Sequence, residues 1–204
     1  MADRSSLTAT TSDADAPDWQ WFARDPLLTA EQQARGWLAL RLHCHPAAVP
    51  LQRSAHGRPQ LLAPHATDDV SWSHSGQGLL VAHACNAMVG IDLEFQRPRK
   101  QADALALRYF HPAEAAWILG QPDVHARQSA FIRLWCVKEA VLKAHGRGLA
   151  FGLDRLCFSE MDGRLQLVAC DAALGDPAQW RLLEFTPHPG YQAAMAWYPG
   201  ILPA

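Results

Sequence analysis

The sequence has few cysteines, no excess of charge of either sign and no long hydrophobic run. Its five cysteines are an odd number scattered through 204 residues, mostly inside apolar segments, which is typical of reduced thiols rather than of a disulfide framework. The 18 Lys and Arg residues against 20 Asp and Glu give a net charge of -2, which excludes the strongly basic surface of a nucleic-acid-binding protein. An apolar run of about 18 residues and a signal-peptide core are both lacking, so we expect a cytoplasmic protein with no membrane or nucleic-acid partner.

What the sequence does have is enough apolar material for a core. Apolar residues make up 49% of the chain, and its length suits one domain or two small ones. Residues 1–18 are rich in Ser, Thr, Ala and Asp without periodicity, and we expect a disordered tail there. His43, Cys44 and His45 invite a metal site, but no second ligand pair stands at zinc-like spacing, so we do not predict one.

Helical and strand-like patterns alternate along the rest of the chain, which predicts an α+β fold. Thr29 is the expected N-cap of a helix from about Ala30, with Gln32 completing a capping box. Residues 49–64 are expected to form a loop. Further helices are predicted at 102–109, from Pro112 onward, and through the long apolar run that ends at Gly146. Strands are predicted at 70–73, 78–84, 87–94, 156–158, 165–169, 180–185 and 191–198. The second and third of these strands are expected to form a hairpin at Cys85–Asn86.

One helix organises the expected chemistry. In the run from Phe131 to Gly148 most of the helix circumference is apolar, and Glu139 and Lys143 share a remaining face with the small Cys136. Isolated buried charge is costly, so a charged pair on such a helix favours contact with something polar, or a function. The alternative is an ordinary exposed pair four residues apart, which contributes about 0.3 kcal/mol.

A strand at residues 89–95 carries a second acidic pattern. Its alternation places Asp92 and Glu94 on one face together with Gly90. Two carboxylates two residues apart can share a hard cation such as Mg2+, with Gly90 leaving space beside them, and Glu139 of the helix would complete an all-oxygen set. The alternative is a solvated strand face, because the pattern Asp-x-Glu is common.

The two stretches together resemble the paired signature of the 4'-phosphopantetheinyl transferases. Residues 90–94, GIDLE, resemble the family's G-[IV]-D-[IV]-E, and residues 135–143, WCVKEAVLK, resemble its W-x-x-K-E-[AS]-x-x-K. Residues 71–75, SWSHS, resemble its F-N-[IL]-S-H-S segment, and residues 57–59, GRP, resemble its G-K-P. Residues 189–194 are similar to its closing strand. The ordered set extends through most of the chain after Arg35.

The resemblance implies an architecture that periodicity does not show. The arrangement is similar to that of the Sfp-like members, which are monomeric pseudo-dimers of two similar α+β halves. The halves would be residues 19–88 and 89–204, with His74 in the first and the carboxylates in the second. Two departures concern the first half: Arg58 replaces the more usual Lys, and Ser71 and Trp72 replace Asn and an aliphatic residue.

The resemblance also implies a reaction. It is the transfer of 4'-phosphopantetheine from coenzyme A to a serine of an acyl or peptidyl carrier protein, with release of adenosine 3',5'-bisphosphate. Mg2+, or Mn2+, would bind Asp92, Glu94 and Glu139, and Glu139 is the candidate base. Lys143 and His74 would contact the phosphates, and Lys138 occupies a family position that leaves a phosphate contact open. The residues expected to hold coenzyme A are Arg58, Ser73, His74 and Lys143, with Arg35 or Arg41 at the 3'-phosphate.

Two other functions fit the same residues. One is a coenzyme A or carrier-protein binding module that has lost catalysis, and the other is a Mg2+-dependent phosphodiesterase that needs no carrier protein. Within the transferase interpretation, the acceptor of fatty-acid, polyketide or nonribosomal-peptide synthesis stays open.

Overall fold

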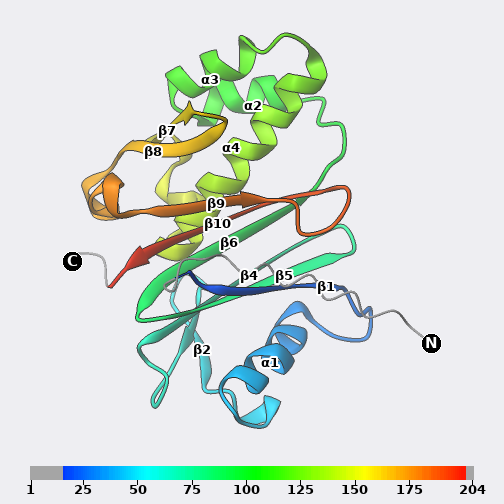
Figure 1. The fold of residues 1–204 in the computed structure, drawn as a ribbon, viewed down its shortest axis with the longest axis vertical. Helices are drawn as coiled ribbons and strands as arrows, with labels where there is room; N and C mark the ends of the chain where they lie inside the picture. Colours follow the sequence, from blue (N-terminus) through cyan, green and yellow to red (C-terminus); the bar gives the residue numbers. More distant parts are fainter. Residues whose placement is uncertain (1–15, 201–204) are drawn as a thin grey trace.

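Two three-stranded antiparallel sheets form the centre of the molecule (Figure 1). The computed structural model describes residues 16–200, so the tail expected at residues 1–18 lies almost entirely outside the described residues. The first sheet has the order β1 (Asp18–Ala23), β5 (Gly78–Cys85) and β4 (Asp68–Ser75). The second has the order β6 (Ala87–Phe95), β10 (Tyr191–Pro199) and β9 (Arg181–Phe185). The division into halves at residues 88 and 89 remains a prediction.

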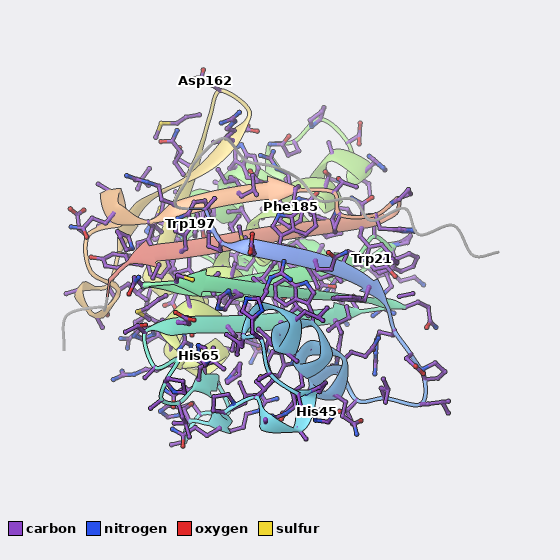
Figure 2. All side chains as sticks on the ribbon, turned by 60° about the horizontal axis from the view of Figure 1, so that its bottom comes forward. Trp21, His45, His65, Asp162, Phe185 and Trp197 are labelled. Atoms are coloured by element: carbon purple, nitrogen blue, oxygen red, sulfur yellow. The ribbon has the colours of Figure 1, made fainter. Side chains whose placement is uncertain are left out.

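Helices cover the outer faces of both sheets. Helix α1 (Ala30–Arg41) packs on the first sheet, and the long helix α4 (Val124–His145) packs on β6 and β10 of the second (Figure 1). An apolar cluster lies between the sheets and includes Leu80, Ile91 and Met195. Figure 2 labels three aromatic members of this layer, Trp21, Phe185 and Trp197. The α+β class is therefore confirmed.

The remaining elements lie around these layers. Helices α2 (Ala102–Tyr109) and α3 (Pro112–Leu119) and the hairpin of β7 (Leu156–Met161) and β8 (Arg164–Cys170) surround α4, and all four were expected from the sequence. Short strands β2 (Leu51–Arg53) and β3 (Pro59–Leu61) pair where a loop was expected. The 3-10 segments are Pro46–Ala48, Gly148–Phe151, Leu153–Arg155, Ala172–Leu174 and Pro177–Gln179. Among residues 16–200, none of the helices is long and apolar enough to cross a membrane.

The predicted hairpin at Cys85–Asn86 is wrong. Strand β5 pairs with β1 and β4, whereas β6 pairs with β10 in the other sheet. A single residue, Asn86, separates the two strands, and its φ of 53° turns the chain from one sheet into the other. A two-stranded hairpin needs at least two residues in its loop, so this link is too short to pair the strands it joins. The hairpin in this region is instead β4–β5, which turns at Gly76.

Helix α4 contains the predicted run from Phe131 but begins earlier, at Val124. Asp123 caps its first turn by accepting a hydrogen bond from the backbone of Ala126, and Gly146 ends it with φ 94°. A Cβ atom on Gly90 would lie 1.9 Å from the carbonyl oxygen of Ala140, so only glycine lets the helix backbone approach β6 this closely. The interpretation that Gly90 leaves space for a cation is therefore wrong, since the helix fills that space.

Candidate active site

Three carboxylates converge where β6 faces α4. Asp92 and Glu94 project from β6, and Glu139 projects from α4. Burial and the negative charges of Asp92 and Glu94 raise the pKa of Glu139 to about 7, although the positive charge of Lys143 opposes the shift. Glu139 is half-buried, and its Oε1 is buried without a hydrogen-bond partner in the described part of the chain. Binding of either a proton or a cation would therefore stabilise this carboxyl group.

Only one of the two carboxylate oxygens of Asp92 has hydrogen-bond partners in the described residues. Its Oδ1 accepts hydrogen bonds from the Ser73 hydroxyl at 2.8 Å and from Lys143 Nζ at 2.7 Å. Its Oδ2 is buried and has no partner among residues 16–200. Lys143 Nζ also donates to the carbonyl of Ile91 at 3.2 Å, so the ammonium group is fixed beside β6. A buried carboxylate oxygen without a partner is costly, which marks this atom as a ligand position.

Glu94 is neutralised by a residue that sequence reasoning did not assign. Its Oε2 accepts hydrogen bonds from the Ser75 hydroxyl at 3.2 Å and from the guanidinium of Arg99. The guanidinium carbon of Arg99 also lies 5.9 Å from the ring centre of Trp135 on α4. The basic residues that follow the strand in sequence were a visible signal for this contact, because a short connection returns them to the strand's end.

Side chains of β4 fix the position of β6. Asp69 Oδ2 accepts from the backbone N–H of Val89 at 2.7 Å, Ser71 Oγ from that of Ile91 at 3.1 Å, and Ser75 Oγ from that of Phe95 at 3.0 Å. Strand β6 lies at the edge of its sheet, so the backbone N–H groups on the side away from β10 need other partners. These three polar side chains, which share one face of β4, supply partners for three of them.

The charge and donor type of the carboxylates fit a hard divalent cation. Two of the three carry a buried oxygen without a partner in the described residues, and all three donate oxygen, which Mg2+ prefers. Within residues 16–200, no choice of one oxygen from each brings the three within 4.8 Å of one another, so a shared cation requires side-chain rotation. Cys136 lies on the same face of α4; its thiol donates to the carbonyl oxygen of Gln192 at 3.8 Å, and burial with the negative charges of Asp92 and Glu94 raises its pKa well above the usual value.

Arg58 connects the carboxylate cluster to two adjoining pockets. Its Nε donates to the carbonyl oxygen of Lys143 at 2.9 Å, and its guanidinium pairs with Asp69. A pocket of about 190 Å³ lies between Arg58, Trp72 and Lys143. A larger one of about 810 Å³ shares Arg58 with it and also contains Arg147. Basic side chains therefore line both pockets, as an anionic ligand would require. None of the three carboxylates lines either pocket, but Lys143 links the smaller one to Asp92. Arg53, missed from the sequence, lines the smaller pocket and lies 4.8 Å from the ring of Trp72.

His74 is placed differently from the other predicted residues of β4. The strand alternates, and Val70 and Trp72 belong to the apolar cluster under α1, so His74 lies on that face. Ser73 faces Asp92 instead. His74 is exposed and lines neither of the two pockets at Arg58. Its contact with phosphate remains a prediction.

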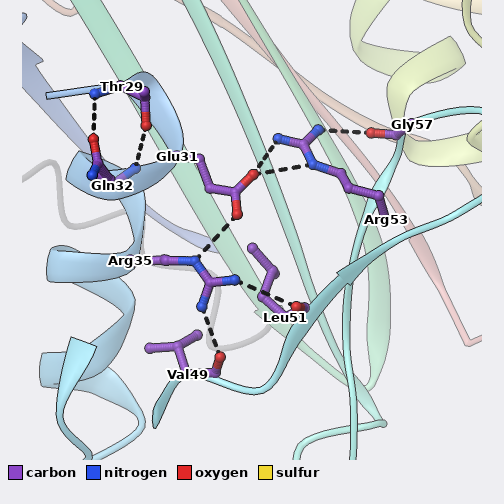
Figure 3. A network of polar contacts seen from close by, with 8 residues as sticks. All are labelled: Thr29, Glu31, Gln32, Arg35, Val49, Leu51, Arg53 and Gly57. Carbon is purple, nitrogen blue, oxygen red and sulfur yellow. Dashed lines mark hydrogen bonds and ion pairs between the residues drawn. The ribbon is translucent and has the colours of Figure 1, made fainter. Parts of the chain in front are cut away.

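Neither Arg35 nor Arg41 lies at these pockets. Arg35 donates to the carbonyl of Val49 at 2.8 Å and to Glu31 at 3.2 Å, and so ties α1 to the start of β2 (Figure 3). Arg41 lies 3.6 Å from the ring centre of Trp37 and pairs with Asp18. In the described chain both guanidinium groups are thus engaged in α1 contacts, and the predicted 3'-phosphate role stays untested.

Lys138 has no access to a ligand. Its ammonium is fully buried, pairs with Glu114 at 2.7 Å, and donates to the carbonyls of Leu153 at 2.8 Å and Leu156 at 2.6 Å. All three of its donors are used, so the phosphate contact left open by its family position is wrong.

Comparisons with known proteins agree on one family. Residues 88–196 match the sequence model of the family described as the 4'-phosphopantetheinyl transferase superfamily. A putative 4'-phosphopantetheinyl transferase of Synechocystis sp. is 30% identical over 156 residues, which is 76% of this chain and 62% of the relative. The 4'-phosphopantetheinyl transferase HetI of Nostoc sp. is 31% identical over 163 residues, 76% of this chain and 63% of the relative.

The chain thus spans less than two thirds of the length of these relatives. Among solved structures, the holo-[acyl-carrier-protein] synthase of Thermotoga maritima matches with a TM-score of 0.44 and 22% identity, covering 55% of this chain and 63% of that one.

Proposed function

The chain belongs to the 4'-phosphopantetheinyl transferase superfamily, and from that premise we propose that it transfers 4'-phosphopantetheine from coenzyme A to a serine of an acyl or peptidyl carrier protein. The second product is adenosine 3',5'-bisphosphate. The protein acts as a monomer of the Sfp-like type, in the cytoplasm. In the described residues its cysteines are all free, which suits a reducing compartment.

One observation carries this proposal. Asp92 and Glu139 each keep a buried oxygen without a partner in residues 16–200, beside the ammonium of Lys143 and next to pockets lined by Arg58. A purely structural ion-pair network would satisfy those oxygens, as it does at Lys138. The arrangement therefore suits a ligand that brings both negative phosphate and positive charge into the site.

Each side chain has a task in the reaction. Arg58 and Lys143 hold the pyrophosphate of coenzyme A, and Lys143 remains where negative charge builds on the leaving phosphate. Glu139 accepts the proton of the carrier serine, directly or through a water molecule, as the hydroxyl attacks phosphorus. Ser73 and Ser75 orient Asp92 and Glu94 through their hydrogen bonds. Mg2+ or Mn2+ on the three carboxylates would neutralise phosphate charge and fix the geometry of transfer.

Intact mass spectrometry of a carrier protein tests the proposal. An apo acyl carrier protein and an apo peptidyl carrier protein are each incubated with the protein, coenzyme A and Mg2+, beside matched carriers whose acceptor serine is replaced by alanine. We expect the mass of one phosphopantetheine to be added only where the serine is present, and the gain to vanish with a chelator.

Two results would contradict this reaction. Binding of coenzyme A without any mass gain on several carriers identifies a non-catalytic module. Cleavage of coenzyme A with no carrier present identifies a phosphodiesterase.

A further inference from the structure

A second cluster of ligating side chains lies at the end of the first sheet, on the face toward α1. The β4–β5 register places Cys85 directly opposite Asp68, and His83 lies two residues before Cys85 on the same face of β5. Further along this face the positions are apolar, as at Val70 and Val81 of the cluster under α1. The α1 face of the sheet thus changes from apolar to metal-ligating side chains at its end.

The ligand atoms are close together. One atom each of Asp68, His83 and Cys85 lies within 4.8 Å of the other two. His65, from the segment before β4, lies beside this group but not within that distance of all three atoms; its Nδ1 is 3.7 Å from Asp68 Oδ2, and a rotation of its side chain would make it a fourth ligand (its position is labelled in Figure 2). Two imidazoles, a thiol and a carboxylate form a donor set typical of zinc sites and unlike the all-oxygen set at Glu139.

The spacing suits a shared ion as well as a direct contact. His83 Nε2 and Asp68 Oδ2 form a hydrogen bond of 3.3 Å. A charge-assisted hydrogen bond between such groups is typically about 2.7–2.9 Å long. Atoms that surround a tetrahedral zinc ion at about 2.0–2.1 Å lie about 3.3 Å from one another. The same carboxylate oxygen faces both imidazoles, as a common ligand position would.

The negative charge of Asp68 also lacks a permanently charged partner, which favours a bound cation. Within the described chain, the ion pairs of Asp68 are with His65 and His83, which carry charge only when protonated, and none is with Lys or Arg. Burial and the negative charges of Asp68 and Asp18 raise the pKa of the Cys85 thiol. A bound divalent cation reverses that preference and releases the thiol proton.

We propose that His65, Asp68, His83 and Cys85 form a binding site for zinc or a similar transition metal, separate from the carboxylate site at Glu139. The ion would join the segment before β4 to β5. Ala66 and Thr67 of that segment, and Asp68 at the start of β4, line the pocket of about 810 Å³. A metal here would therefore fix one wall of that pocket without taking part in chemistry at Glu139.

Cobalt spectroscopy on the full chain tests this site without any activity measurement. The metal-free protein is titrated with Co2+, and the thiolate-to-cobalt charge-transfer band and the visible d–d bands are recorded. We expect one equivalent to bind with tetrahedral spectra, Zn2+ to abolish the bands, and Mg2+ in large excess to leave them unchanged, because Mg2+ prefers oxygen ligands.

Matched variants locate the ion. Cys85→Ser should remove the charge-transfer band and weaken Co2+ binding by more than about tenfold, since even outer-shell partners of a metal cost that much. Cys157→Ser is the control, because its sulfur also lies near a histidine, 3.4 Å from His111 Nδ1, but outside the cluster. It should keep the band.

His83 is buried, so its replacement can disturb folding. His65 is more exposed, and His65→Gln therefore provides a second test of metal binding. It should weaken Co2+ binding while the circular dichroism of the fold is unchanged. Absence of the band in the wild-type protein, its persistence in Cys85→Ser, or unaltered binding by His65→Gln would overturn the proposal. The cluster would then be a hydrogen-bonded His–Asp–His contact beside a free thiol.

Discussion

Lys138 and Glu139 are neighbours in the chain but lie in opposite kinds of environment. Lys138 is fully buried, and each of its three donors has a partner: Glu114 and two backbone carbonyls. Glu139 is half-buried, and its Oε1 has no partner in the described residues. Both side chains are charged groups on one apolar helix, so residue type does not separate them, although their angles around the helix differ.

The difference lies in what satisfies each charge. At Lys138 the protein supplies everything, so the group contributes to the fold and has nothing left for a ligand. At Glu139 the protein supplies two further carboxylates and leaves oxygens unpaired, which costs stability until a proton or cation arrives. We therefore assign a structural role to one face of α4 and a functional role to the next.

The largest effect on stability should come from breaking the satisfied pair. Lys138→Met leaves the Glu114 carboxylate buried without its partner, which lowers the free energy of unfolding by about 3–5 kcal/mol. Urea denaturation at neutral pH measures the loss. The double variant Lys138→Met/Glu114→Leu should recover only part of it. It removes the unpaired charge, but the backbone N–H groups of His111 and Phe158 lose the carboxylate that accepts their hydrogen bonds. A single variant as stable as the wild type would contradict the structural role.

Glu139→Gln should instead raise the free energy of unfolding at alkaline pH. The pKa of Glu139 is about 7 in the folded protein, against an ordinary value of 4.5 in the unfolded chain, so between these values the folded protein binds a proton that the unfolded chain has lost. The stabilising effect of that proton is complete below pH 4.5 and is lost as the pH rises through 7.

At pH 8, with a chelator present, the Gln variant should therefore be more stable than the wild type by up to about 3 kcal/mol, and near pH 4 the difference should shrink. Thermal unfolding across this pH range measures both. If the two proteins show parallel pH profiles, the carboxyl of Glu139 is not destabilised by its surroundings.

A smaller effect should follow from removing a positioning hydroxyl. Ser71→Ala deprives the buried N–H of Ile91 of its partner, which costs about 1–3 kcal/mol. The edge of β6 should loosen beside Asp92, so transfer should slow as well. Ser159→Ala, at an exposed position of β7, is the control and should change neither quantity. Equal behaviour of the two variants would show that β4 does not hold the site.

The smallest effect is expected at α1. Arg35→Gln removes contacts to Glu31, Val49 and Leu51, which lowers the free energy of unfolding by about 1 kcal/mol, because these bonds are partly exposed. The KM for coenzyme A should stay within about twofold, since Arg35 lines neither pocket at Arg58. An increase in KM of tenfold or more would contradict this and support the predicted contact of Arg35 with the 3'-phosphate of coenzyme A.

The sequence predicted the elements of the site better than their contacts. Periodicity located α4 and β6, and the helix angle alone separated Lys138 from Glu139. It could not show that α4 reaches β6 at Gly90, because that contact joins segments far apart in the chain. The same limit explains the wrong hairpin at Asn86, where both strands were located correctly but their partners were not.

Clusters formed across strands were invisible for the same reason. Asp68 and Cys85 are opposite each other only once the β4–β5 register is known. The spacing of His83 and Cys85 was the one local signal, since two residues on a strand share a face. Arg99 was visible as part of a basic run, but its pairing with Glu94 depends on how the connection folds back.

The most direct test of the division between the two faces of α4 compares Glu139→Gln with Lys138→Met in carrier-protein transfer, at equal concentrations of folded protein. Phosphopantetheine added per minute is followed by intact mass, with folded fractions measured in parallel. The account predicts that Lys138→Met keeps wild-type turnover per folded molecule within about threefold, while Glu139→Gln loses at least about 100-fold. Normal turnover by Glu139→Gln, or an equal loss in both variants, would contradict it.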